Sequence, residues 1–162
     1  MANSGSDNIS VLVGNGNGTF QAQQQYSVHD YPADISLADL NGDGHLDFVT
    51  ANANSTDVSV RLGYGNGTFQ NEQRFTSGGS PNWVEIADLD GDGIEDIITS
   101  NSSTHDVGVL LGDGDGTFQF QQHYLVGTYP LLGVIADING DGLPDVVVTN
   151  QSTNDISVLL HQ

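Results

Sequence analysis

The chain of 162 residues contains no cysteine and no lysine, and its only basic side chains are Arg61 and Arg74. The lack of cysteine excludes disulfides and thiolate metal sites. The formal net charge of −19 excludes nucleic acids and anionic membrane surfaces as partners, because lysine and arginine make those contacts. No apolar run approaches the ~18 residues of a membrane span, so no membrane insertion is expected. Cations, neutral ligands such as glycans, and a second copy of the chain remain as partners.

What the sequence does contain is a repeat of 49 residues, visible in the acidic stretches that begin at Asp39, Asp88 and Asp137. The stretch "ISVLVGNGNGTFQ", from residue 9, returns in related form at 58–70 and 107–119, and "ISVLL" follows at 156–160. We therefore place repeats at 14–62, 63–111 and 112–160, with 1–13 as an extra copy of the last segment of the repeat. All of them belong to one partial propeller domain over residues 1–162, as the next features indicate.

Each repeat contains four short strand-like segments, for example "DISLADL", "DFVTAN", "DVSVRL" and "NEQRFTS", separated by glycine-rich turns. No window has the apolar spacing of an amphipathic helix, so essentially no helix is expected. Four strands in a repeat of about 40–50 residues indicate one β-propeller blade. The predicted fold is all-β: three four-stranded repeats plus one extra strand, thirteen strands in all, forming half of a six-bladed ring.

Three acidic loops share the pattern D-x-[DN]-x-D-G-x-x-D. Such a loop can surround one hard cation, and Ca²⁺ takes roughly six to eight oxygen ligands. The first, third, fifth and ninth residues would offer side-chain oxygens, and the seventh its backbone carbonyl. The predicted ligands of three calcium sites per chain are Asp39, Asn41, Asp43, His45 and Asp47; Asp88, Asp90, Asp92, Ile94 and Asp96; and Asp137, Asn139, Asp141, Leu143 and Asp145.

An EF-hand loop opens with the same pattern but closes with a glutamate at its twelfth position. The twelfth residues here are Thr50, Thr99 and Val148, and a strand-like segment follows each loop. Mg²⁺ is less favoured than Ca²⁺, because it prefers few protein ligands and several waters. Without a cation the carboxylates of a loop repel one another, so the fold is expected to depend on calcium.

The stretch "DLNGDGHLDFVTAN", followed by "VSVRLGYGNGTF", resembles the FG-GAP/VCBS repeat, the calcium-binding blade of integrin α-subunit propellers and some fungal lectins. The resemblance covers the whole chain. It implies a propeller blade that holds calcium between its first two strands, on the fifteen residues named above. The literal Phe-Gly and Gly-Ala-Pro motifs of integrins are absent, so no integrin ligand is implied. The family includes adhesion modules, lectins and appendages of polysaccharide-active enzymes.

No part of the sequence resembles a nucleophile with its base, and every acidic cluster is triplicated and already assigned to metal. We therefore expect no enzyme, but a calcium-stabilised scaffold or binding module for protein interaction or adhesion. The alternative is a carbohydrate-binding lectin, in which Trp83, the only tryptophan, would stack on a sugar; core packing is the other interpretation of this residue. Weak calcium sites suit an extracellular, secreted protein, whose targeting segment would lie outside this chain.

Two aromatic series follow the repeat: Phe20, Phe69 and Phe118, and Tyr26, Phe75 and Tyr124. Their fixed register favours packing between blades over sugar platforms.

Three blades are too few for a ring, because propellers have typically four to eight. Two chains would supply six blades, so a homodimer is expected. The stretch "GTFQAQQQYSVHD" near the N-terminus offers the fourth strand that the last blade lacks. However, "ISVLV" at 9–13 duplicates "ISVLL" at 156–160, and the sequence leaves open which copy takes the shared place.

Overall fold

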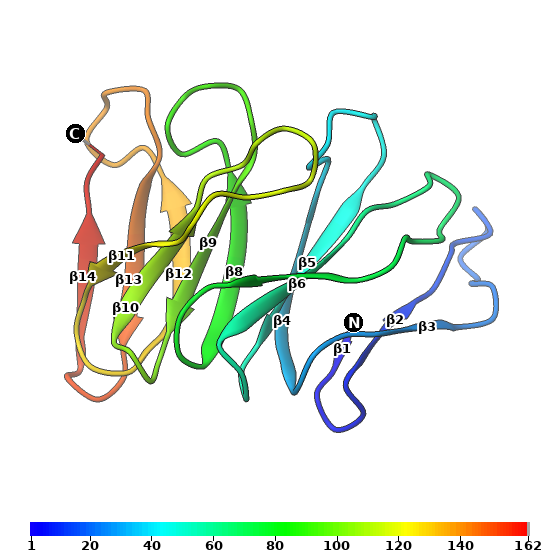
Figure 1. Cartoon of the computed structure of the whole chain (residues 1–162), viewed down its shortest axis with the longest axis horizontal. Helices are drawn as coiled ribbons and strands as arrows, with labels where there is room; N and C mark the ends of the chain where they lie inside the picture. Colours follow the sequence, from blue (N-terminus) through cyan, green and yellow to red (C-terminus); the bar gives the residue numbers. More distant parts are fainter. Residues whose placement is uncertain (162) are drawn as a thin grey trace.

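Residues 1–161, the part of the chain that the computed structural model describes, form fourteen β-strands arranged as a fan of antiparallel sheets (Figure 1). Within these residues there is no helix, and hence none that could cross a membrane. The strands are β1 (Ala2–Asn3), β2 (Asn8–Val11), β3 (Gln24–Ser27), β4 (Pro32–Ala38), β5 (Asp47–Asn52), β6 (Asp57–Arg61), β7 (Gln73–Thr76), β8 (Pro81–Ala87), β9 (Asp96–Asn101), β10 (Asp106–Leu110), β11 (Gln122–Leu125), β12 (Pro130–Ala136), β13 (Asp145–Asn150) and β14 (Asp155–Leu159).

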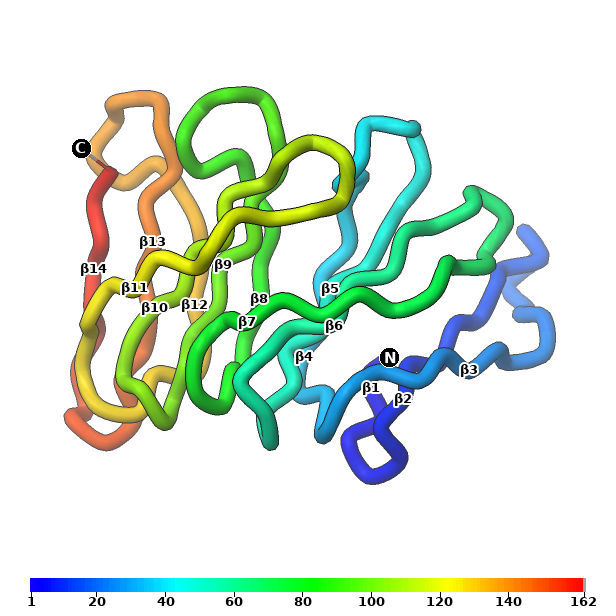
Figure 2. Tube along the Cα trace, viewed as in Figure 1, coloured from blue at the N-terminus to red at the C-terminus, as the bar shows by residue number. Residues whose placement is uncertain are grey.

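The strands form four sheets in chain order: β1-β2-β3, β4-β5-β6-β7, β8-β9-β10-β11 and β12-β13-β14. Two complete blades thus stand between two three-stranded sheets, and the array is not closed into a ring. Figure 2 shows the chain passing from sheet to sheet, so that its two ends lie in different terminal sheets. The predicted all-β class and propeller blades are confirmed.

The predicted number of thirteen strands is wrong by one. The additional strand is β1, whose two residues pair with Ile9 and Asn8 of β2. These residues repeat the end of β5, Ala51 and Asn52, so the chain opens on a remnant of a second strand rather than on a third strand. A two-residue strand has no alternation of its own and exists only because β2 offers a pairing edge.

The sheets and the sequence repeats are out of phase. Repeat 63–111 begins with β7, which pairs with β6 and completes the sheet of the repeat before it. The same holds for β11, which pairs with β10 although it belongs to repeat 112–160. Each complete blade therefore combines segments of two consecutive repeats.

One apolar core fills the space between each pair of neighbouring sheets. The second strands are covered on both faces, which is why β5 and β9 are buried along their whole length. The cores are centred on Phe48 between the first and second sheets, on Val49 and Ile97 between the second and third, and on Val146 between the third and fourth.

Four of the six residues of the aromatic series pack between blades, as predicted, whereas Phe20 and Tyr124 are exposed. Phe69 contacts Tyr26 edge to face at 5.3 Å between ring centroids, and Phe118 contacts Phe75 in the same way at 5.1 Å. Phe69 and Phe118 each follow the third strand of one blade, and each contacts a residue on the fourth strand of the blade before it. These contacts join sheets that share no hydrogen-bonded strands.

Candidate metal centres

The three acidic loops connect the first and second strands of their blades. Residues 39–46 join β4 to β5, residues 88–95 join β8 to β9, and residues 137–144 join β12 to β13. All three lie along one edge of the fan, the upper edge in Figure 1. The repeat therefore presents three equivalent loops side by side.

The second loop is folded by its own acids. Asp88 accepts backbone N–H groups from Asp92 at 3.1 Å and from Gly93 at 2.9 Å, one on each carboxylate oxygen. Asp90 accepts from the N–H of Asp92 at 3.2 Å, and Asp92 from that of Ile94 at 2.8 Å. Gly93 has a φ of 87°, a conformation that a side chain disfavours. These bonds curl the backbone around the carboxylates.

The other two loops have the same geometry. Asp39 accepts from the N–H of Gly44 at 2.8 Å, and Asp137 from that of Gly142 at 3.0 Å. In both loops the third position is an asparagine, which donates its side-chain amide to the acid two residues on. The seventh residues, His45, Ile94 and Leu143, donate their N–H groups to Asp43, Asp92 and Asp141 at 2.9, 2.8 and 2.9 Å.

The second loop brings three acids to a distance that suits one cation. Oxygens of Asp88, Asp90 and Asp96 all lie within 4.8 Å of one another, so this cluster could hold a metal ion. In the other loops a neutral asparagine, Asn41 or Asn139, stands in the place of Asp90. Those loops therefore have one carboxylate fewer, although an amide oxygen is also a ligand that Ca²⁺ accepts. The donor set is all oxygen and fits a hard cation.

The acid at the ninth position of each loop pattern has a structural role that the sequence analysis missed. Asp96 is buried and accepts N–H groups from Leu89 at 2.8 Å and from Gly112 at 2.9 Å. Asp47 accepts equivalent bonds from Leu40 and Gly63, at 2.8 and 2.6 Å. We call Asp47, Asp96 and Asp145 the latch aspartates. Each accepts the backbone N–H of the residue two positions after the third strand of its blade. In the last blade this residue is His161, at 2.8 Å.

The electrostatic setting of the latch aspartates differs along the chain. Burial raises the pKa of Asp96, backbone N–H bonds oppose it, and Asp90 and Asp92 raise the pKa further. Burial likewise raises the pKa of Asp47. The pKa of Asp145 is lowered instead, chiefly by the N–H groups of His161 and Ile138, although its side chain is as inaccessible to solvent as that of Asp47. In the first two loops a cation would offset the cost of the buried charge.

Asp39, the first acid of its loop, behaves in the opposite way to Asp47 and Asp96. For Asp39, burial raises the pKa, but four backbone N–H groups, with that of Gly44 first, together lower it below the ordinary value. This carboxylate is thus held ionised at the position where a cation would bind.

Trp83, the candidate sugar-stacking residue, is only 5% exposed and belongs to the core between the third and fourth sheets. Its indole ring occupies the space beside Gly133, where an added Cβ would lie 2.7 Å from the ring. A sugar platform needs an open ring face. The structure thus places Trp83 in a core position, the second interpretation that the sequence offered.

Comparison with known proteins is consistent with this architecture. A search of curated proteins finds no match. Among solved structures, an Agrocybe aegerita lectin, described as recognising non-reducing terminal N-acetylglucosamine, aligns with a TM-score of 0.60 and 21% identity, over 94% of this chain and 46% of that one. A Tc holotoxin pore of Photorhabdus luminescens aligns with a TM-score of 0.51 and 17% identity, over 93% of this chain and 8% of that one.

This chain therefore spans about half the length of the lectin and a small part of the toxin, and at these identities the likeness shows the fold alone. The FG-GAP-like repeat matches three times, over residues 1–50, 39–99 and 88–148. Together these matches cover most of the sequence, and each includes at least one of the acidic loops. The chain belongs to the FG-GAP-like repeat family.

Proposed function

We propose that the chain is a calcium-stabilised, non-catalytic propeller module whose function is binding. The observation that carries this proposal is the cluster of Asp88, Asp90 and Asp96, whose oxygens lie within 4.8 Å of one another in a loop that occurs three times. When bound, Ca²⁺ would neutralise charge in a chain with a net charge of −19. The first, third and fifth residues of each loop would hold it, and the latch aspartate would fix the loop to the blade.

The non-catalytic part of the proposal rests on repetition. The acids of the three loops are the same residues that fold those loops, and they recur at a spacing of 49 residues. A scaffold for protein interaction or adhesion, made of two copies of the chain and located outside the cell, suits both the fold and the weaker calcium sites proposed for the first and third loops. Asn41 and Asn139 would weaken those sites, because each stands where the second loop has the carboxylate of Asp90.

Calcium binding is tested by titration calorimetry on calcium-depleted protein. Three sites per chain are expected, falling to two in Asp90→Ala. Asp113→Ala is the matched control, because Asp113 lies in the glycine-rich loop after β10, outside the acidic loops, and should retain all three sites. The absence of any calcium uptake by the intact chain would refute the proposal.

Glycan recognition is the second candidate function. It is supported by the fold shared with the Agrocybe aegerita lectin, whose described ligand is terminal N-acetylglucosamine. A glycan array that includes this terminal sugar tests it directly, with and without calcium. If no glycan is bound in either condition, the lectin candidate is rejected and the protein-binding scaffold remains.

A further inference from the structure

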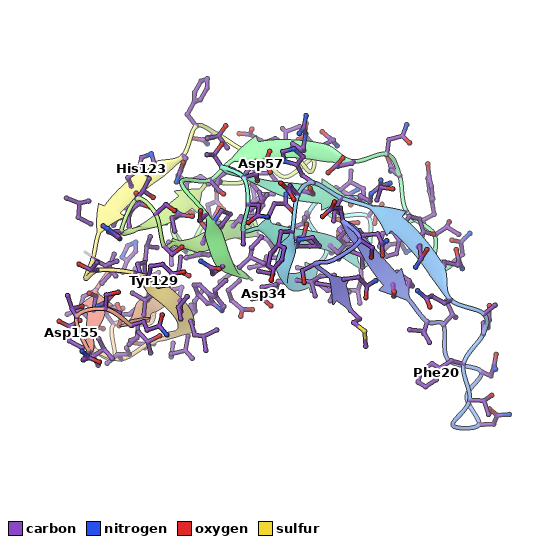
Figure 3. All side chains as sticks on the ribbon, turned by 90° about the horizontal axis from the view of Figure 1, so that it is seen from below. Phe20, Asp34, Asp57, His123, Tyr129 and Asp155 are labelled. Carbon is purple, nitrogen blue, oxygen red and sulfur yellow. The ribbon has the colours of Figure 1, made fainter. Side chains whose placement is uncertain are left out.

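One member of the aromatic series, Phe20, does not pack against a neighbouring blade. Phe20 is 63% exposed, whereas Phe69 and Phe118 are packed between blades. Its loop, residues 14–20, which we call the free loop, has the sequence and the closing bridge of the other two, with Gly14 facing Phe20. Figure 3 shows Phe20 projecting at one end of the molecule, far from Asp155 at the other. A packing element that recurs at a spacing of 49 residues thus lies in solvent.

The place that such a loop occupies is present and vacant at the other end. A cleft of about 530 Å³ lies between the third and fourth sheets, on the side of β11. Its walls include Val107, Val109, Tyr124 and Val146. These residues stand 98 positions after Ile9, Val11, Tyr26 and Phe48, which surround Phe69 between the first and second sheets. The cleft is therefore the repeat equivalent of the site that Phe69 fills between the first and second sheets.

We propose that the occupant of this cleft is Phe20 of a second copy of the chain. Strands β2 and β3 and the free loop of each copy would complete the last blade of the other, giving a ring of six blades. This inference rests on the proposed two-chain scaffold and assigns the surface that builds it. Phe20 would meet Tyr124 as Phe69 meets Tyr26 and as Phe118 meets Phe75.

The glycines of the free loop support the same docking. A Cβ at Gly63 would overlap the carbonyl oxygen of Leu46, and one at Gly112 that of Glu95, so neither position accepts a side chain. Gly14 is their counterpart, yet a Cβ there meets nothing within 4 Å. In the docked position it would face the carbonyl of Pro144, the residue that follows Glu95 by 49 positions. A close approach of this kind explains why a glycine stands at residue 14.

The structure also indicates which of the two copies of the third strand, β2 of the partner or β14, would occupy the shared place in the last blade. Ile9 in β2 is 1% exposed, because it packs on the second sheet, whereas its counterpart Ile156 in β14 is 62% exposed. Displacing β14 therefore uncovers little buried apolar surface, although it breaks the five-residue pairing with β13, which the incoming strand would have to replace; displacing β2 would open a core. We infer that β2 of the partner replaces β14.

The polar partners at this position are equivalent in the two strands. Asn150 donates its side-chain amide to Asp155 and to Ser157 of β14, at 2.9 Å each. Asn3 makes the same pair of bonds to Asn8 and Ser10 of β2, at 2.8 and 2.6 Å. The incoming strand can thus satisfy Asn150. Likewise, the N–H of Gly14 would replace that of His161 on the latch aspartate Asp145 and complete the third loop.

Light scattering in calcium over a range of protein concentrations tests the docking. The intact chain should have twice its mass of 17.1 kDa. Phe20→Ala and Gly14→Ala should each raise the dimer dissociation constant at least tenfold. Phe120→Ala is the matched control, because Phe120 is fully exposed and outside the aromatic series, and it should leave the dimer unchanged.

A stable monomer of the intact chain would overturn the inference, and so would a dimer that Phe20→Ala leaves intact. Calorimetric calcium binding by the same samples reports separately on the proposed function, since loops one and two lie within single copies. Ile156→Asp tests the strand replacement. It should not affect the dimer if β14 is displaced, and a loss of the dimer would show that β14 remains in the blade.

Discussion

The latch aspartates make a prediction that separates folding of the loop from metal binding. Asp96→Ala removes the acceptor of two bonds, a part-buried one from the N–H of Leu89 and a buried one from the N–H of Gly112. It also removes one carboxylate of the acid cluster. Asp92→Ala is the matched comparison, because Asp92 belongs to the same loop but is exposed. It accepts the N–H of Ile94 in its own loop rather than one from the connection after the third strand.

The expected cost follows from the two donors that Asp96→Ala leaves unsatisfied. A buried polar group without a partner costs about 1–3 kcal/mol, so two of them cost about 2–6 kcal/mol in the free energy of unfolding. For a domain of this size, 1 kcal/mol corresponds to about 2–4 °C, so the melting temperature should fall by roughly 5–20 °C. The loss does not require a cation, because both bonds are between protein groups.

Thermal unfolding in excess chelator is the assay that isolates this effect. In chelator, Asp96→Ala should melt well below the intact chain, while Asp92→Ala should stay close to it. In calcium, both variants should lose the second site, and Asp96→Ala should lose stability in addition. Equal melting temperatures of the two variants in chelator would refute the structural role of the latch aspartate, since Asp96 would then act as a metal ligand alone.

Other predictions concern calcium, pH and salt. Saturating calcium should raise the melting temperature, because a site filled at a hundredfold excess over its Kd adds about 2.7 kcal/mol; identical melting curves with and without chelator would contradict this. In calcium-depleted protein the raised folded-state pKa values of Asp47 and Asp96 imply stability that is present below the unfolded carboxyl pKa and is lost as pH rises through the folded pKa. The melting temperature of the intact chain should therefore fall relative to that of Asp96→Asn as pH rises from acidic to neutral, since the lowered pKa values of Asp39 and Asp145 act in the opposite direction in both proteins. Raising ionic strength from 0.01 to 0.15 M shortens the screening length from about 30 to about 8 Å and should tighten the dimer of chains that each carry −19; a weaker dimer at higher salt would argue against apolar docking.

The strands were predictable because the period of 49 residues repeats every local signal. A segment such as "DFVTAN", which is ambiguous alone, becomes interpretable when its copies occur in the same register. What the period could not reveal is the closing of a sheet by the next repeat, because pairing of β7 with β6 depends on contacts across the repeat boundary. The remnant β1 was missed for a similar reason.

The fold of the acidic loops was predictable for the opposite reason, because their residues are local. Nine consecutive positions contain the whole donor set, and the structure folds them with bonds between residues two to five apart. The latch is not local: Asp47 receives the N–H of Gly63, sixteen residues on. The available signal was the glycine itself, which recurs as Gly112 for no reason visible in the strand pattern.

Trp83 shows how a departure from the repeat can mislead. A single tryptophan in one copy suggests a ligand, because binding sites are often singular. The sequence holds a second departure that offsets it: Gly133 stands where the earlier copies have Ile35 and Val84. The large ring and the missing side chain meet between the third and fourth sheets, so the two departures conserve the volume of one core.

The two ends of the array are complementary because every interface in it is built from the same repeat positions. Repeat proteins usually need terminal repeats with polar outer faces, and the terminal sheets of residues 1–161 instead expose Leu12 and Phe20 at one end and Ile156 and Val158 at the other. Two unlike faces of one molecule that fit each other generate either a closed ring or an open filament, depending on the rotation between copies. The rotation is already set within the chain by the contacts that relate one blade to the next. If it closes after six blades, the mass stops at two chains, whereas an open filament would grow with concentration.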